Sequence, residues 1–293
     1  MFRIFTILWL TATPALGLWE KGLKVRFGID PNDVESFLPL PETAVEAEGA
    51  GWKNVTGLAP PEGYEKLFLM CPENDYTLCM FYDDTGYVAG YQISFDPARF
   101  TNANYNWTVS GYKTWTAIEN GVSIDFHTVT QYFMSPAFLN TPAETRIAKR
   151  NRNTILQDNT LYVTGFNGKL YPVPTSIDKI KSDGIYTPQG CMAGMGNHYY
   201  YNMTTSLPCG EDSIFTWFVL EYDDSLTAMG FLIPGKYSIT EGHTDYFELP
   251  TRPFIEMNAP RAPECIYRYP EEYGMLTMHL YFIKEPYDMT CVD

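Results

Sequence analysis

Hydrophobic and polar residues alternate in short runs along most of the chain, and turn-forming residues separate the runs. A period of two is typical of β-strands that bury one face. Separators such as Asn167-Gly168 and Asn120-Gly121 are typical of tight hairpin turns. We expect strands over residues 66–70, 77–82, 87–95, 122–133, 161–166, 169–173, 199–203, 215–222, 228–233, 246–249, 254–257 and 276–283. The pattern predicts an all-β fold with mainly antiparallel sheets.

Helical periodicity is scarce. The best candidate is 142–150, where Pro142 stands at the start and Ala143-Glu144 open the first turn. This segment carries the only dense basic group of the chain, Arg146, Lys149, Arg150 and Arg152. We interpret the group as a solvated helix face, with an anion site as the alternative.

Two parts of the chain share one pattern in the same order. Residues 79–93 read CMFYDDTGYVAGYQI, and residues 219–233 read VLEYDDSLTAMGFLI. Both patterns are a strand, a Tyr-Asp-Asp turn and a second strand with a glycine before an aromatic residue. Further along, TVTQYF at 128–133 parallels TMHLYF at 277–282. The repetition predicts two related β-modules, and chance similarity between hairpins is the alternative.

The length of 293 residues permits one large or two medium domains. The polar segment 141–160 is the expected boundary between the two halves. We therefore expect a signal peptide at 1–17, a first module at 18–140, the connecting segment at 141–160 and a second module at 161–293. The modules are expected to form a pseudo-symmetric barrel or sandwich pair with little helix, and a single larger barrel is the alternative.

The first residues are typical of a secretory signal peptide. Arg3 precedes the apolar run 4–10, and small residues follow at Ala15-Leu16-Gly17. The run is far shorter than the about 20 residues that a membrane-spanning helix needs. We expect cleavage after Gly17, export from the cell and no insertion into a membrane.

Six cysteines and three N-glycosylation sequons agree with an extracellular location. An even number of cysteines suits disulfides in an oxidising compartment. The cysteines are Cys71, Cys79, Cys191, Cys209, Cys265 and Cys291, and the sequons begin at Asn54, Asn106 and Asn202. Their order does not decide the pairing; we expect sequential pairs, 71–79, 191–209 and 265–291.

Charge and motifs exclude several classes of function. The formal net charge of −15, from 35 acidic and 20 basic residues, repels nucleic acids and anionic membranes. The chain has no G-x-S-x-G nucleophile elbow, no C-x-x-C pair and no helical H-E-x-x-H motif. The carboxylate pairs Asp83/Asp84 and Asp223/Asp224 lie at predicted turns, where aspartate is favoured for local hydrogen bonds.

The chain has four histidines, and three lie in aromatic, strand-like surroundings: His127, His198 and His279. Strand histidines that point into one cavity could bind zinc, copper or iron. The alternative for each is a buried histidine that is hydrogen-bonded within an aromatic core. His243 follows Glu241-Gly242 and is interpreted as a surface turn residue.

Four segments carry a resemblance to a known family: 79–93, GFNGKL at 165–170, CMAGMGNHYYYNM at 191–203 and 277–282. In these segments, and over most of the chain after residue 17, the sequence resembles a family of secreted arthropod proteins. The resemblance implies an exported protein, but the family has no assigned activity.

Aromatic residues make up 16% of the chain, with 22 tyrosines and 18 phenylalanines. We therefore expect an extracellular β-protein that binds a small apolar or aromatic molecule in an aromatic-lined cavity. The candidate ligand-binding residues are His198, His279, Tyr199, Tyr200, Trp217, Tyr281 and Phe282. One alternative is an extracellular enzyme of cupin-like type with a metal ion held by His198, His279 and His127. Another is a structural or matrix protein that uses exposed tyrosines for cross-linking.

Overall fold

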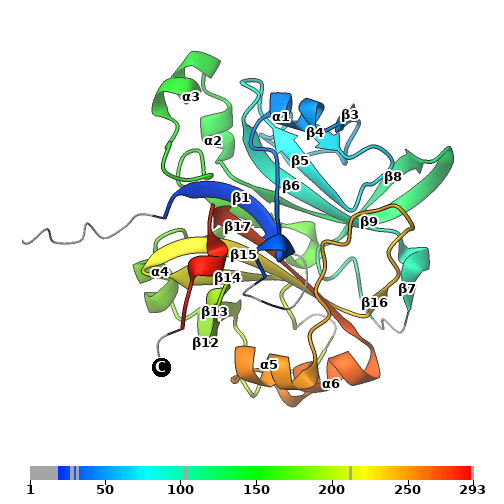
Figure 1. Cartoon of the computed structure of the whole chain (residues 1–293), viewed down its shortest axis with the longest axis vertical. Helices are drawn as coiled ribbons and strands as arrows, with labels where there is room; N and C mark the ends of the chain where they lie inside the picture. Colours follow the sequence, from blue (N-terminus) through cyan, green and yellow to red (C-terminus); the bar gives the residue numbers. More distant parts are fainter. Residues whose placement is uncertain (1–18, 27–29, 31–32, 102–104, 211–212, 292–293) are drawn as a thin grey trace, which may run out of the picture.

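The computed structural model describes residues 19–26, 30, 33–101, 105–210 and 213–291. Within them the chain forms two large antiparallel sheets that pack against each other, with short helices at the periphery (Figure 1). The predicted class, mainly antiparallel β with little helix, is confirmed. The predicted signal peptide at 1–17 lies outside the described residues.

The first sheet has eight strands. Seven of them follow one another in the order β11-β10-β9-β6-β5-β4-β3, and β8 pairs with β9 beside this path. The strands are β3 (Lys53–Val55), β4 (Phe68–Cys71), β5 (Leu78–Tyr82), β6 (Val88–Phe95), β8 (Lys113–Glu119), β9 (Val122–Tyr132), β10 (Leu161–Thr164) and β11 (Leu170–Val173).

The second sheet has seven strands in the order β12-β13-β14-β15-β17-β1-β2. They are β1 (Lys21–Arg26), β2 (Phe37–Pro39), β12 (Tyr186–Met192), β13 (Gly196–Tyr201), β14 (Trp217–Tyr222), β15 (Ser225–Pro234) and β17 (Met275–Ile283). A small third sheet joins β7 (Phe100–Thr101) to β16 (Lys236–Tyr237). Both large sheets end in edge strands in the described part of the chain, so neither closes into a barrel.

The helices are short. They are α1 (Ala44–Gly49), α2 (Pro136–Leu139), α3 (Ala143–Lys149), α4 (Ile177–Ser182), α5 (Arg252–Asn258) and α6 (Glu264–Glu272), with single 3₁₀ turns at Val34–Ser36, Pro97–Arg99, Phe166–Gly168 and Pro286–Asp288. None of the helices in the described residues is long and apolar enough to cross a bilayer. The helix α3 confirms the prediction over 142–150. The strand predicted at 254–257 is wrong, because these residues belong to α5.

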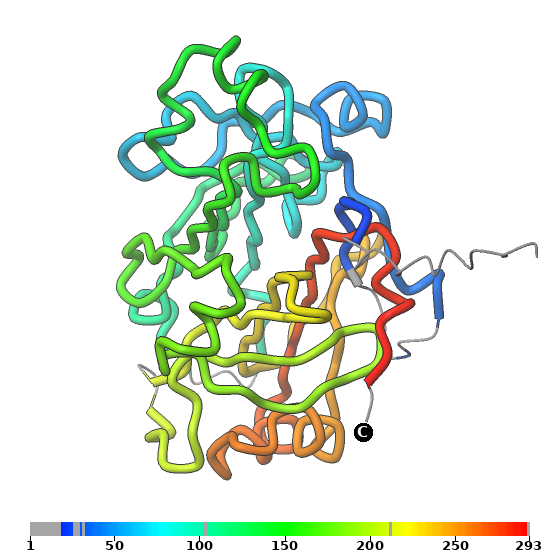
Figure 2. Tube along the Cα trace, turned by 90° about the vertical axis from the view of Figure 1, so that its left-hand side faces the viewer, coloured from blue at the N-terminus to red at the C-terminus, as the bar shows by residue number. Residues whose placement is uncertain are grey.

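The strands of the two large sheets follow the chain in a similar order from one edge to the other. From one edge, the first reads β3-β4-β5-β6-β9-β10-β11 and the second β12-β13-β14-β15-β17-β1-β2. The N-terminal strands β1 and β2 therefore stand in the second sheet where β10 and β11 stand in the first. Figure 2 shows the dark blue N-terminal segment beside the red end of the chain, and β1 pairs with β17. Strand pairing thus crosses the predicted module boundaries at both ends, and the division into 18–140 and 161–293 stays a prediction.

Aromatic side chains fill the space between the sheets. Phe95 of β6 stacks on Phe231 of β15, with ring centroids 5.8 Å apart. Trp217 of β14 is 1% exposed, and its indole N–H donates to the Thr164 carbonyl of β10 at 2.7 Å. Burial of these rings removes apolar area from water, the main favourable term in folding.

The basic segment at 142–150 is solvated only in part: Lys149 is exposed, but its central arginine is buried. Arg146 has no exposed side-chain surface and forms ion pairs with Asp83 at 3.5 Å and with Asp84. Arg150 lies over the Tyr87 ring, 4.1 Å from its centroid, and also contacts Asp83. The Tyr-Asp-Asp turn between β5 and β6 is therefore fixed by α3. The prediction of a solvated face was wrong for Arg146, because helical periodicity does not show which turn elsewhere in the chain supplies the counter-charges of a basic residue.

The structure corrects two of the three expected disulfides. The pair Cys71–Cys79 is formed as expected. The others join Cys191 to Cys291 and Cys209 to Cys265, across sequence separations of 100 and 56 residues. Sequential pairing is wrong because the C-terminal tail runs back to β12 and α6 packs near the loop that follows β13.

The predicted glycosylation sites lie at or near the surface. Asn54 in β3 and Asn202 after β13 are exposed, while Asn106 is half-buried. The side-chain carbonyl of Asn106 accepts a hydrogen bond from the Val109 backbone N–H at 3.1 Å.

Candidate functional site

A small cavity lies on the outer face of the second sheet, beneath α5 and α6. Figure 1 shows these two helices at the end of the molecule away from the first sheet. The cavity has a volume of about 20 Å³, enough for one water-sized group. Its main lining residues come from four strands and both helices: Tyr200, Phe218, Leu232, Thr277, His279, Phe254, Ile255, Asn258, Ala259 and Ile266.

Strand alternation decides which of the predicted ligand-binding residues reach this cavity. Neighbouring residues of a strand point to opposite faces of the sheet. Tyr200 and His279 line the cavity. Tyr199, Trp217 and Phe282 belong to the core between the two sheets. The structure therefore splits the candidate set between two faces.

Tyr281 and His198 lie on the same side of the sheet as the cavity but do not line it. The Tyr281 hydroxyl donates to the Gly194 carbonyl at 2.8 Å. The His198 ring lies 5.8 Å from the His279 ring, centroid to centroid. These two residues support the cavity rather than line it.

The histidine pair is part of a buried polar network. His198 Nδ1 is 3.3 Å from the Gly190 carbonyl oxygen, and the Asn258 side-chain nitrogen is 3.2 Å from His198 Nε2. His279 Nδ1 is 2.9 Å from Glu248 Oε1. His198, His279 and Glu248 are at most 2% exposed. Buried polar groups of this kind are normally hydrogen-bonded, and such a network holds its members in one geometry.

Three polar atoms that belong to cavity-lining residues have no hydrogen-bond partner in the described part of the chain. They are Asn258 Oδ1, Thr277 Oγ1 and His279 Nε2, and all are buried. An unsatisfied buried donor or acceptor costs about 1–3 kcal/mol. The cavity thus combines an apolar lining with polar atoms that can bind an additional group.

Stacked rings form the cavity's aromatic wall. Tyr200 and Phe218 stack with centroids 4.4 Å apart, and Phe218 meets His279 edge-on at 5.4 Å. Burial, together with the negative charge of Glu248, raises the pKa of Tyr200 well above its usual value. The Tyr200 phenol is therefore neutral at physiological pH and available as a hydrogen-bond donor.

His127 is not close to the other two strand histidines in the topology. It lies in β9 of the first sheet, and its ring packs 4.6 Å from the Trp107 ring. Burial lowers the pKa of His127. Among the described residues, no group of three or more His, Cys, Asp or Glu side chains is placed to hold a metal ion. The histidine metal site therefore receives no support from the arrangement.

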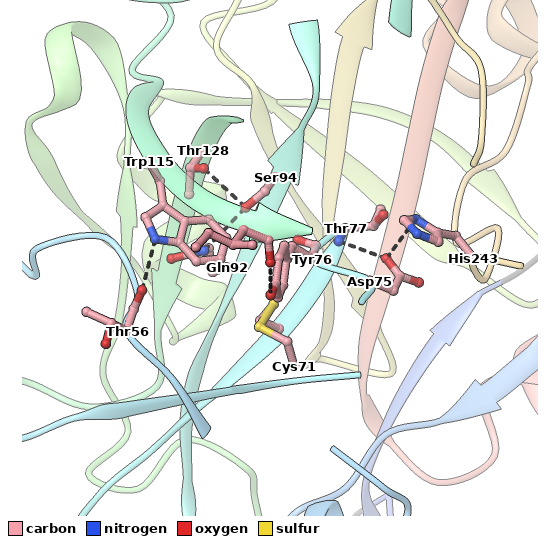
Figure 3. The surroundings of a disulfide bond; sticks show 12 residues. Thr56, Cys71, Asp75, Tyr76, Thr77, Gln92, Ser94, Trp115, Thr128 and His243 are labelled. Atoms are coloured by element: carbon pink, nitrogen blue, oxygen red, sulfur yellow. Dashed lines mark hydrogen bonds and ion pairs between the residues drawn. A yellow bond between two sulfur atoms is a disulfide. The ribbon is translucent and has the colours of Figure 1, made fainter. Parts of the chain in front are cut away.

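His243 is not the exposed turn residue that the sequence indicated. Figure 3 shows it beside Asp75, in the surroundings of the Cys71–Cys79 disulfide. Its side chain is 9% exposed, and Nδ1 is 3.4 Å from Asp75 Oδ1. The expectation from the glycine-containing turn failed because the loop folds back onto the first sheet. His243 joins the loop after β16 to that sheet and does not line the cavity.

Larger surface hollows are polar and open. A groove of about 660 Å³ is bordered by Trp19, Asn153, Asn159, Asp224 and Phe282, among others. Its residues Asn153, Asn159 and Asp224 are exposed, so water satisfies their polar groups. The cavity beneath α5 and α6 is the better candidate because three buried, unpaired polar atoms belong to its lining, against only Trp19 Nε1 among the described residues of the groove.

Sequence reasoning missed Glu248, Asn258 and Thr277. Asn258 was missed because residues 254–257 were predicted to form a strand, whereas Asn258 is the last residue of the helix α5. The signal for a helix was present, because Thr251 precedes Arg252 and Pro253, and proline is favoured in a first helical turn. No sequence signal marks the pairing of Glu248 with His279, since the residues are 31 positions apart.

No protein-family model, no curated protein and no solved structure matches this chain. The site must therefore be interpreted from its own geometry.

Proposed function

We propose that this protein is a secreted binding protein that holds a small molecule with an apolar body beneath α5 and α6. The observation that carries the proposal is the set of three buried, unpaired polar atoms around an apolar cavity. A ligand group that paired with them would recover part of the cost of their burial. Pockets of this composition, mostly apolar with a few polar groups, are typical of small-molecule sites.

The two helices over the cavity form a unit that could move together. Arg252 of α5 forms an ion pair with Glu264 of α6 at 3.1 Å, and the Tyr267 hydroxyl donates to the Ala259 carbonyl at 2.9 Å. Neither helix has a side-chain hydrogen bond at its N-cap. Because the closed cavity admits only a water-sized group, a larger body requires an outward shift of α5 and α6 at Phe254 and Ile266.

The proposed location rests on the disulfides and the sequons. All six cysteines are paired in three disulfides, which fits an oxidising compartment. The exposure of Asn54 and Asn202 supports glycosylation at those positions. Membership of the secreted arthropod family is part of the same proposal.

The two alternatives receive less support. A structural protein that cross-links through tyrosine needs exposed rings, yet only Tyr273 among the 22 tyrosines is exposed, at 36%. A metal-dependent enzyme needs three convergent ligands, which the described residues do not provide.

The strand orders also favour an origin of the two sheets by duplication, with β1 and β2 completing the second unit. The registers differ, however. Gly90 of β6 lies opposite Tyr132, whereas Gly230 of β15 lies opposite His279. The two units would therefore share an order of strands without sharing a site.

Small fluorinated aromatics test the binding proposal by ¹⁹F NMR. The probes are fluorobenzene, 4-fluorobenzyl alcohol, 4-fluorobenzylamine and 4-fluorophenylacetate. We expect at least one to bind saturably to the wild-type protein. The variant Ala259→Phe should abolish this binding, because Ala259 lines the cavity and is 2% exposed.

The matched control is Met257→Phe, which adds a ring to α5 at a side chain that is 56% exposed. This variant should bind the same probe as tightly as the wild type. Absence of binding by every probe, or equal binding by Ala259→Phe, would contradict the proposed function.

A further inference from the structure

The hydrogen bonds of His198 determine which atom Asn258 presents to the cavity. A backbone carbonyl only accepts, so His198 carries its proton on Nδ1, which lies 3.3 Å from the Gly190 oxygen. Nε2 of the neutral ring is then an acceptor, and the Asn258 side-chain nitrogen donates to it at 3.2 Å. The unpaired atom of Asn258 is its oxygen, an acceptor.

Glu248 orients His279 in the same way. Its carboxylate accepts from His279 Nδ1 at 2.9 Å, and in the neutral tautomer with the proton on Nδ1 the other ring nitrogen, Nε2, is an acceptor. Two acceptors cannot hydrogen-bond to each other, and neither Asn258 Oδ1 nor His279 Nε2 has a partner among the described residues. The Thr277 hydroxyl can donate or accept. The cavity therefore requires a group with more than one hydrogen-bond donor.

Charge favours a cationic donor. The Glu248 carboxylate is 2% exposed and lies directly behind His279, and the whole chain has a net charge of −15. Tyr200 and Phe218 line the cavity, and aromatic rings attract cations. An anionic group would meet two acceptors and a like charge in a site with little water.

Size limits the cation further. The closed cavity, about 20 Å³, suits a group of the size of water, and an ammonium group is of this size. We infer that the ligand is a primary amine whose ammonium group donates to Asn258 Oδ1 and His279 Nε2, with an apolar or aromatic body between the sheet and the two helices. The inference rests on the proposed function and adds the chemical class of the ligand.

The fluorinated probes also test this inference, because three of them differ mainly in the polar end. At pH 8, we expect 4-fluorobenzylamine to bind at least about tenfold more tightly than 4-fluorobenzyl alcohol or 4-fluorophenylacetate, since hydrogen bonds to a charged group are the stronger ones. Glu248→Gln keeps an acceptor for His279 but removes the negative charge. It should reduce the affinity for the amine about tenfold and change that for the alcohol little.

Two more variants complete the experiment. Asn258→Leu removes one acceptor and should weaken binding of the amine strongly. Glu256→Gln removes an exposed charge from the same helix and should leave binding unchanged.

The outcomes separate the inference from the proposed function. Equal or tighter binding of the alcohol or the carboxylate overturns the amine assignment and leaves the binding function standing. Binding of the amine that survives both Glu248→Gln and Asn258→Leu also overturns it, since the amine would then bind elsewhere on the acidic surface. No binding by any probe overturns the function itself.

Discussion

Replacement of Arg146 by alanine should destabilise the protein by about 3–5 kcal/mol, the usual cost of breaking a buried ion pair by removing one partner. Neither Arg146 nor Asp83 has any exposed side-chain surface. Without Arg146, the only ion pair that Asp83 keeps among the described residues is the one with Arg150 at 3.5 Å. The Leu139 carbonyl would also lose its hydrogen bond from Arg146 Nη1, now 2.8 Å long. The loss therefore combines a buried carboxylate that keeps one long ion pair with a backbone acceptor that loses its donor.

The free energy of unfolding can be measured by urea denaturation, followed by tryptophan fluorescence with the disulfides intact. The control is Lys149→Ala, on the exposed side of the same helix, which should change the free energy of unfolding by less than about 0.5 kcal/mol. If Arg146→Ala were no more destabilising than the control, the buried ion pair would not stabilise this fold and the reasoning would be refuted.

A double variant distinguishes charge from shape. Asp83 Oδ1 accepts from the Thr85 backbone N–H at 2.9 Å, and an asparagine oxygen can do the same. Asp83→Asn combined with Arg146→Met should recover most of the stability lost in Arg146→Ala, because no buried charge then remains unpaired. A double variant as unstable as Arg146→Ala would indicate that the hydrogen bonds from Arg146 to backbone carbonyls, not its charge, dominate at this position.

Two further predictions concern covalent and pH-dependent stability. Removal of the Cys191–Cys291 disulfide by double serine substitution should lower the free energy of unfolding by roughly 4–5 kcal/mol in the chain-entropy description, because the bond closes a separation of 100 residues. Removal of Cys71–Cys79, with a separation of 8, should lower it by roughly 2–3 kcal/mol. Similar losses for the two in urea denaturation would contradict the dependence on loop length. Burial lowers the pKa of His127, so the unfolded chain takes up the proton first, and this residue's contribution to stability should fall as pH decreases from about 6.5 towards its lower folded pKa. His127→Gln should flatten the pH dependence of the melting temperature in that range, and an unchanged profile would contradict the assignment.

Local pattern was sufficient for the strands and turns. The hairpin with Asn167-Gly168 at its tip is present, with β10 paired to β11 and Asn167 at a φ of 57°. A two-residue period and a turn that needs positive φ are properties of neighbouring residues, so the sequence shows them directly. The class of the fold and the position of α3 were predictable for the same reason.

The candidate site was predictable only in part. Aromatic strand context led to His198, His279 and Tyr200, which the structure brings together. It also led to Trp217 and Phe282, which face the opposite side of the sheet. Both faces of the central strands β15 and β17 are buried, so neither face is polar. The sequence therefore does not show to which side of the sheet each side chain points.

Only the tertiary structure decided which distant segments meet. It places β1 beside β17, Cys191 beside Cys291 and Glu248 beside His279. These contacts depend on how whole sheets and helices pack, and the same local pattern is compatible with many such packings. Local sequence patterns were therefore sufficient to predict the strands, the turns and the presence of disulfides. The cavity depends on contacts between segments that are far apart in the sequence, which local patterns do not show.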